Sequence, residues 1–156
     1  MQVVDRAVVT LCIGRHNPIP VASAEEASRV WQFYREALNL GGSNSPHALL
    51  KSGHLTLGYV SYNGRVWNGR PTVPVKVQNA RTPIAEAADI RTGIRVGDWL
   101  PVEDMVDGLL LMGKVTAIHR EDRALTLNTG ARVIYMPTDI KKIERYFTHI
   151  PYFSAK

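Results

Sequence analysis

The strongest constraint on the fold is one amphipathic helix pattern that begins at Ser23. Ser23 and Glu26 have the S-x-x-E spacing of a capping box, in which both side chains accept hydrogen bonds from free amides of the first turn. Five apolar residues follow at helical spacing and form one stripe, namely Ala27, Val30, Trp31, Tyr34 and Leu38. Gly41-Gly42 is expected to end the helix, because glycine accepts the left-handed conformation found past a helix C-terminus. The stripe must be buried against a second layer, which the rest of the chain has to supply.

The remainder of the first half predicts a small antiparallel sheet. Strands are expected over residues 3–13, 55–62, 65–67 and 73–78, from their β-branched and aromatic content. Two prolines exclude residues 16–20 from a strand, and residues 43–48 are expected to be a loop. Asn63-Gly64 predicts a two-residue hairpin turn. Residues 1–78 are therefore predicted to be a mixed α/β unit, with one amphipathic helix packed on the sheet.

The second half has a different pattern, with short strands joined by short turns. Residues 79–93 are expected to be a connector that contains a short helical piece at Ala85–Ile90. Five strands are predicted over residues 94–100, 109–118, 124–128, 132–136 and 141–147, with one helical turn at 137–140. Closure of five short strands into a barrel would remove most exposed edges. The predicted fold class is therefore α+β, with a small five-stranded β-barrel and a C-terminal tail in residues 94–156.

Three short motifs in this half occur in an order that is similar to a known group of barrels. They are Val96-Gly97-Asp98-Trp99, Gly113-Lys114-Val115 with Ile118, and Thr138-Asp139-Ile140. From Val96 to Tyr146 the chain resembles the SH3-like barrels of the KOW, Tudor and chromatin-reader type. Such barrels bind nucleic acid, methylated side chains or protein segments, so the resemblance implies a binding module without choosing its ligand. Trp99 and Tyr135 are the residues expected to line a barrel groove or an aromatic cage.

The positive charge of the chain is unevenly distributed. The net charge of +5 consists of three parts. Residues 1–78 hold eight Lys and Arg against four Asp and Glu (+4), residues 79–140 hold seven against nine (−2), and residues 141–156 hold four against one (+3). A basic surface attracts polyanions, so any such surface is expected in the first half and the tail rather than in the barrel segment.

Two segments mix basic and aromatic residues, as surfaces that bind nucleic acid do. The candidate residues for contact with nucleic acid or a protein partner are Tyr62, Arg65, Trp67, Arg70 and Lys76 around the first hairpin, and Lys141, Lys142 and Arg145 in the tail. The alternative is that Tyr59 and Trp67 belong to the core and the arginines only border it. Aromatic residues of the tail, such as Tyr152 and Phe153, could also support oligomerisation.

Catalytic and metal-binding motifs are sparse. Ser43 and Ser45 lie close to His47 in sequence, which leaves open a small hydrolase or transferase, although the context lacks the strand–turn–helix of a nucleophile elbow. No phosphate-binding glycine motif and no H-E-x-x-H occurs. Cys12 with His16 offers two metal ligands without a third. We therefore expect no catalytic residues, no cofactor and no metal.

These observations leave three hypotheses. The first is a non-catalytic binding protein that acts on or near nucleic acid. The second is an accessory or inhibitor protein of a phage or mobile element, such as an anti-CRISPR protein, that docks on a nucleic-acid machine; this rests on analogy. The third is the hydrolase or transferase. The single cysteine indicates a reducing, cytoplasmic compartment, and the lack of a long apolar run argues against a membrane partner.

Overall fold

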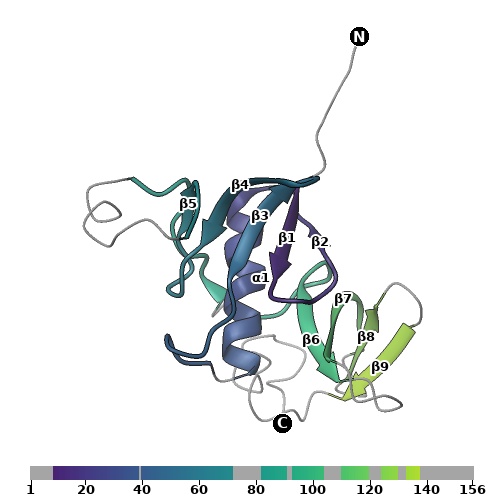
Figure 1. Cartoon of the computed structure of the whole chain (residues 1–156). Coiled ribbons are helices and arrows are strands. Elements are labelled where there is room, and N and C mark those ends of the chain that lie inside the picture. The colour runs from purple at the N-terminus through teal and green to yellow at the C-terminus, as the bar shows by residue number, and fades with distance from the viewer. Residues whose placement is uncertain are drawn as a thin grey trace. The chain divides into compact units, whose positions relative to one another are not determined.

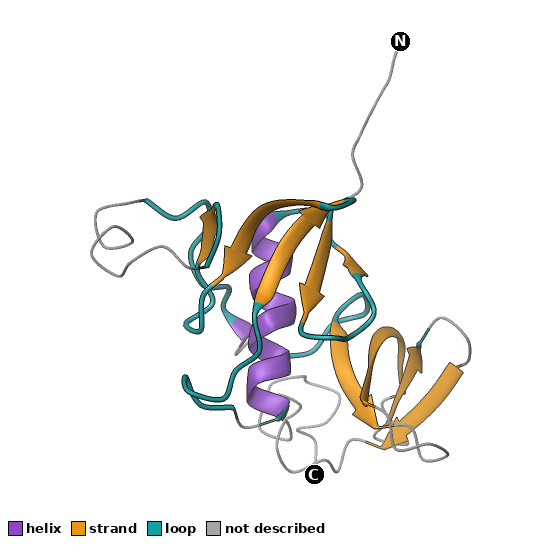
Figure 2. Cartoon of the chain, viewed as in Figure 1, coloured by secondary structure: helices purple, strands orange, loops and turns teal. Residues whose placement is uncertain are grey.

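The chain contains one α-helix and two antiparallel sheets in the part that the structure describes, which confirms the α+β class (Figures 1 and 2). The computed structural model describes residues 9–38, 40–71, 82–90, 93–103, 110–119, 124–129 and 133–137. Contacts group the chain into two compact units, Met1–Trp31 with Ser45–Ala88 and Gln32–Asn44 with Asp89–Lys156. No helix within the described ranges is long and apolar enough to span a membrane.

The first unit is built on a five-stranded antiparallel sheet. Its strands are β1 (Thr10–Ile13), β2 (Ile19–Pro20), β3 (Ala48–Ser52), β4 (Leu55–Val60) and β5 (Val66–Asn68). Their order in the sheet is β2-β1-β3-β4-β5. The first turns of α1 lie against one face of this sheet (Figure 1).

Strand register explains which side chains form the core of the first unit. Ile13 pairs with Ala48, Ala48 with Val60, and Val60 with Val66, so the four side chains form one row on one face. All four are buried, as are Ala27, Val30 and Trp31 from the predicted helical stripe. The sheet therefore supplies the second layer that the amphipathic helix requires.

Helix α1 (Ala24–Ala37) begins as predicted and ends earlier than predicted. The Glu26 amide donates to Ser23 Oγ at 3.0 Å, while the Glu26 carboxylate accepts from the Ala22 amide, one residue before the usual capping-box partner. The Leu40 amide donates to the Arg35 carbonyl at 3.1 Å, a closure across five residues that is typical of a Schellman end. Gly41-Gly42 therefore lies beyond the helix end, and the prediction that it ends the helix is wrong.

The predicted hairpin between β4 and β5 is present, but its turn lies one residue earlier. The Gly64 amide donates to the Ser61 carbonyl at 2.8 Å, which places Tyr62 and Asn63 at the turn centre. Gly64 follows with φ of 91°, a left-handed conformation that favours glycine. The loop is thus a turn followed by a bulge glycine, a common three-residue hairpin connection.

Three further expectations in the first half need correction. The loop predicted over residues 43–48 ends one residue early, and a strand that was not predicted, Ala48–Ser52, lies at the centre of the sheet between β1 and β4. Residues 16–20 were predicted not to form a strand, but Ile19–Pro20 forms the short edge strand β2. Pro20 is exposed there, and an edge position tolerates its missing amide hydrogen. The segment Ala85–Ile90 is not a helix, because Ile84 and Ala85 pair in extended form with the backbone of Val66. Residues 3–8 and 73–78, also predicted as strands, lie outside the described residues.

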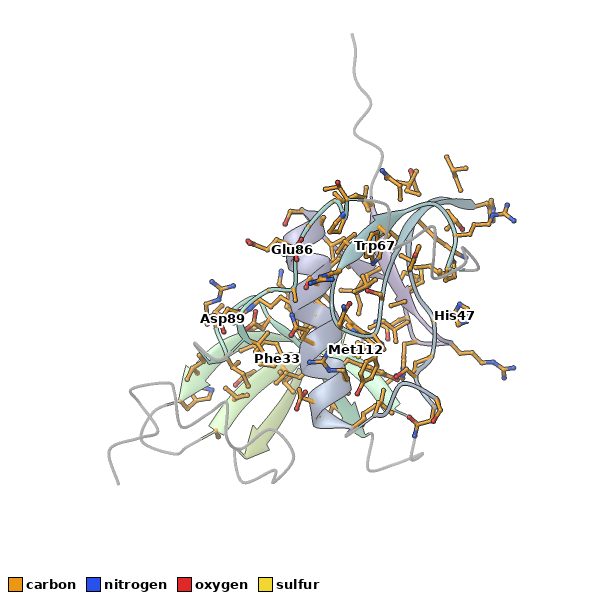
Figure 3. The ribbon with its side chains drawn as sticks, turned by 90° about the vertical axis from the view of Figure 1, so that its left-hand side faces the viewer. Phe33, His47, Trp67, Glu86, Asp89 and Met112 are labelled. Atoms are coloured by element: carbon orange, nitrogen blue, oxygen red, sulfur yellow. The ribbon has the colours of Figure 1, made fainter. Side chains whose placement is uncertain are left out.

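The second unit contains a four-stranded antiparallel sheet. Its strands are β6 (Trp99–Glu103), β7 (Leu110–His119), β8 (Ala124–Asn128) and β9 (Val133–Pro137), in sequential order. The register between β7 and β8 shifts between Val115 and Ala117, which leaves Thr116 as an unpaired bulge residue. The core of the unit joins residues of α1 and the sheet, namely Phe33, Ala37, Ile90, Ile94, Leu100, Val102, Val115, Leu125 and Leu127; Phe33 is labelled in Figure 3.

The predicted closed barrel is not seen in the described strands. β6 and β9 are the two edges of the sheet, and no pairing joins them within the described ranges. The predicted fifth strand at 141–147 and the turn at 138–140 lie outside the described residues, and Pro137 belongs to β9. The described part of this unit is thus an open meander.

Candidate binding pocket on the second sheet

A row of three side chains crosses the sheet of the second unit. Trp99 on β6 pairs directly with Lys114 on β7, and Lys114 pairs with Asn128 on β8. Directly paired residues of an antiparallel sheet project from the same face with Cβ atoms about 4.5–5.5 Å apart. The register therefore brings an indole, an ammonium and an amide side by side from three parts of the chain.

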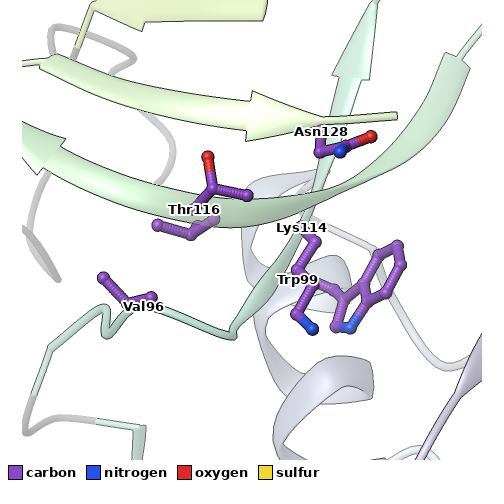
Figure 4. A pocket seen from close by; sticks show the side chains of 6 residues that line it. Val96, Trp99, Lys114, Thr116 and Asn128 are labelled. Atoms are coloured by element: carbon purple, nitrogen blue, oxygen red, sulfur yellow. The ribbon is translucent and has the colours of Figure 1, made fainter. Parts of the chain in front are cut away.

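This row lines an open pocket of about 440 Å³ (Figure 4). Val96, Val115 and Thr116 complete the lining. Thr116 is the bulge residue, and its hydroxyl donates to the Thr126 carbonyl at 3.2 Å. A volume in the range of about 300–1,000 Å³ is typical of pockets that hold a small molecule or one group of a larger ligand.

A hydrogen-bonded turn before β6 holds the apolar end of the pocket. Asp98 is buried, with 6 % exposure, and its carboxylate accepts from the Arg95 amide at 2.7 Å. The Gly97 amide donates to the Val115 carbonyl at 2.8 Å, and the Val115 amide donates to the Asp98 carbonyl at 2.7 Å. Gly97 has φ of 102°, which a residue with a side chain rarely adopts. The turn thereby presents Val96 at the rim, where it is 61 % exposed.

The pocket lining favours a flat or anionic group over a cation. Trp99 is half-buried, whereas Trp31 and Trp67 are almost fully buried at 1 % and 7 % exposure, so Trp99 is the most accessible of the three tryptophans. Lys114 is exposed and is the charged residue among the six that line the pocket. A methylated ammonium group placed on the indole would meet the like charge of Lys114. The geometry suits a ring that stacks on Trp99 and a negative group beside Lys114.

The hairpin residues predicted from sequence are found in different environments. Trp67 is buried in the first unit, and its indole donates to Ser61 Oγ at 3.0 Å (Figure 3). Arg65 forms an ion pair of 3.1 Å with Glu86, with its side chain 49 % exposed. Tyr62 is 43 % exposed at the hairpin tip, and Arg70 is exposed beyond it. The hairpin thus presents Tyr62 and Arg70 at the surface, while Trp67 packs inside.

Other predicted residues lie outside the described part of the chain. These are Lys76, Lys141, Lys142 and Arg145, and the side chain of Tyr135 on β9. Of the predicted groove pair, the structure therefore places Trp99 alone. Sequence reasoning did not identify Lys114, Thr116 and Asn128 as site residues. The available signal was the alternation of polar and apolar residues at Lys114, Val115 and Thr116.

The residues of the hydrolase hypothesis lie in the loop before β3. Ser43 and His47 are exposed, and Ser45 is half-buried. The His47 side chain lies at the outside of the ribbon (Figure 3), while its carbonyl accepts from the Gly14 amide at 3.0 Å. Within the described residues, no group of three His, Cys, Asp or Glu side chains is arranged to hold a metal ion. The hydrolase hypothesis stays a prediction.

Comparison with known proteins finds no match. No family model, no curated protein and no solved structure is similar to this chain. Function must therefore be argued from the residues themselves.

Proposed function

We propose that the protein is a non-catalytic binding protein that acts on or near nucleic acid. The observation that carries the proposal is the cross-strand pair of Trp99 and Lys114 in one open pocket. Proteins that bind single strands combine cations for the phosphates with aromatic rings on which bases stack. The pocket brings one group of each kind together.

The mild negative charge of residues 79–140 does not oppose this proposal at the pocket itself. Charges on the surface are screened over a Debye length of about 10 Å at 0.1 M salt, so the nearest groups matter most. Among the described residues that line the pocket, Lys114 carries an ammonium group and none carries a carboxylate. The local field at the pocket therefore favours a phosphate.

We also propose that the second unit is an SH3-like barrel. The support is the ten-residue strand β7, which pairs with β6 along one half and with β8 along the other. The bulge at Thr116 lies within the pairing with β8, and a bulge of this kind increases the local twist that a sheet needs to curl into a small barrel. Closure would need a further strand from the residues after β9.

Titration with short oligonucleotides at two salt concentrations tests the proposed function. We expect binding of the full chain to single-stranded DNA or RNA at about 50 mM salt, and weaker binding at about 200 mM because phosphate contacts release counterions. Absence of binding to single-stranded and duplex oligonucleotides at the lower salt concentration would refute the proposal.

A second candidate function is docking on a protein component of a nucleic-acid machine. It is favoured by exposed apolar side chains of the first unit, Leu55 at 64 % and Leu57 at 39 % exposure on β4. Exposed apolar groups that lie together mark interaction surfaces more often than isolated ones do. The test is a pull-down from nuclease-treated lysate with the wild type and with the double variant Leu55→Ser/Leu57→Ser. A protein that the wild type still captures after nuclease treatment, and that the variant does not capture, supports docking. Loss of every captured protein after nuclease treatment refutes it.

A further inference from the structure

We infer that the pocket on the second sheet holds one unpaired base of a single-stranded nucleic acid, stacked on Trp99, with a neighbouring phosphate at Lys114. The inference rests on the proposed function and adds the form of the nucleic acid and the role of each residue. It makes Trp99 the stacking residue and Lys114 the phosphate contact.

The neighbourhood of the two groups matches the layout of a nucleotide. Trp99 and Lys114 are direct partners in the register of β6 and β7, so their side chains leave the sheet on the same face. The four-carbon stem of a lysine lets the ammonium reach past the edge of the neighbouring ring. A base on the indole would therefore have its own backbone within reach of the Lys114 charge.

The pocket favours an unpaired base over a base pair. Inside a duplex both faces of each base are covered by stacking, and exposing one face requires extrusion of the base, which costs a few kcal/mol. An unpaired base offers its face without that cost. The half-buried Trp99 ring lines an open pocket of about 440 Å³, which has room for one base.

The walls of the pocket are compatible with a base of any identity. Val96 at the rim is apolar and 61 % exposed, so it can cover part of the ring of a bound base. The Thr116 hydroxyl donates its hydrogen to the Thr126 carbonyl, and its lone pairs can accept from a base amino group. Stacking tolerates all bases because each has a π-face, so we expect little sequence preference.

The accessibility of Trp99 gives a direct measurement. Trp31 and Trp67 are buried in the first unit, so an added oligonucleotide can quench the fluorescence of Trp99 far more than theirs. We expect a single-stranded homopolymer of about ten nucleotides to quench the wild-type emission and to leave Trp99→Phe nearly unquenched. Phenylalanine keeps an aromatic face, so Trp99→Phe should retain most of the affinity measured by anisotropy of a labelled oligonucleotide.

Affinity measurements on matched variants test the two roles. Trp99→Ala should weaken single-strand binding roughly 5- to 150-fold, the loss equivalent to one stacked base. Lys114→Gln should reduce the slope of log K against log salt by about 0.7, the value for one phosphate contact on a single strand. Arg15→Gln is the matched control, since it removes one exposed charge from the first unit at a residue with no predicted role in binding, and it should change the slope less than Lys114→Gln does. If Trp99→Ala fails to fold by circular dichroism, the comparison of Lys114→Gln with Arg15→Gln and the quenching of Trp99→Phe still test the inference.

Each result separates this inference from the proposed function. Binding that is unaffected by Trp99→Ala and Lys114→Gln overturns the inference and leaves the proposed function standing. Equal or tighter binding of a duplex of the same length also overturns the inference alone. Capture of an acidic peptide by the pocket, with no binding of either form of nucleic acid, overturns both.

Discussion

Replacing Gly58 by alanine should destabilise the first unit by pushing β5 away from β4. Gly58 is buried on β4 and pairs with Asn68 on β5. A Cβ at this position would lie well under 3.0 Å from the backbone carbonyl oxygen of Trp67, closer than real Cβ atoms approach. The obstacle is backbone of the neighbouring strand rather than the end of a flexible side chain. The strand pair therefore has to separate before the methyl group fits.

The size of the effect follows from the kind of strain. Forcing an extra methyl group into a packed region typically costs about 1–3 kcal/mol. Urea lowers the free energy of unfolding of small proteins by about 1–3 kcal/mol for each molar of urea. With a slope of about 2 kcal/mol per molar, the urea midpoint of Gly58→Ala should be lower than that of the wild type by roughly 0.5–1.5 M. Gly42→Ala is the matched control, because Gly42 is exposed and an added Cβ there meets nothing within 4 Å. That variant should match or slightly exceed wild-type stability.

The assay must report on the first unit alone, since two units need not unfold together. In a Trp99→Phe background the tryptophan emission comes from Trp31 and Trp67, which both belong to the first unit. Urea unfolding followed by this emission then gives the midpoint for the unit that contains Gly58. A midpoint for Gly58→Ala equal to that of Gly42→Ala would refute the argument from close strand approach.

Three other substitutions have expected outcomes that urea unfolding can check. Ser23→Ala removes the acceptor of the Glu26 amide and should cost about 1 kcal/mol, whereas Ser23→Asn should cost little; equal loss in both would contradict the capping role. A double-mutant cycle on Arg65 and Glu86 should give a coupling energy of at most about 1 kcal/mol, because the side chains are 49 % and 71 % exposed. This coupling energy should decrease as the salt concentration rises, and a larger coupling that does not depend on salt would contradict the prediction. Burial raises the pKa of Tyr34 above its ordinary value of 10.0, so at alkaline pH the folded state keeps a proton that the unfolded chain loses. The contribution of Tyr34 to the free energy of unfolding is therefore fully present below about pH 10 and decreases above it. Tyr34→Phe should reduce this loss of stability at alkaline pH.

Local sequence signals predicted the elements whose cause is local. The cap at Ser23 and the apolar stripe fixed α1, and Asn63-Gly64 indicated the hairpin between β4 and β5. β3 was not predicted, because the apolar run Ala48-Leu49-Leu50 is too short to show the two-residue alternation of a strand. Its place at the centre of the sheet comes from partners on both sides, β1 and β4, which no local pattern displays.

The wrong helix prediction at Ala85–Ile90 shows tertiary contacts prevailing over propensity. Alanine and glutamate in this segment favour a helix, but a helix of one or two turns is marginal without packing. In the extended form, the Val66 amide donates to the Ala85 carbonyl and the Ile84 amide donates to the Val66 carbonyl. The Ala88 amide also donates to the Ser28 hydroxyl of α1 at 2.9 Å. These contacts join residues far apart in sequence, so composition could not reveal them.

The candidate pocket shows the same division between local and distant information. Trp99 was predicted as a groove residue from the resemblance of its segment to SH3-like barrels. Lys114 and Asn128 join it only through the register of β6, β7 and β8. A shift of register by one residue would turn Lys114 to the opposite face, so the sequence alone could not pair it with Trp99.

Register also explains how a segment with an acidic total can present a basic site. The sum over residues 79–140 is −2, and it argued for placing any nucleic-acid contact elsewhere. The sum counts carboxylates without regard to where they lie. Asp98, for example, is buried, and its carboxylate accepts from the Arg95 backbone amide in the turn rather than lining the pocket. Because screening limits each surface charge to its neighbourhood, the field at Trp99 depends first on Lys114 among the described residues that line the pocket. The net charge of a segment therefore predicts how strongly the whole segment attracts ions of opposite charge at long range, whereas the strand register decides which charged side chain lies at the pocket.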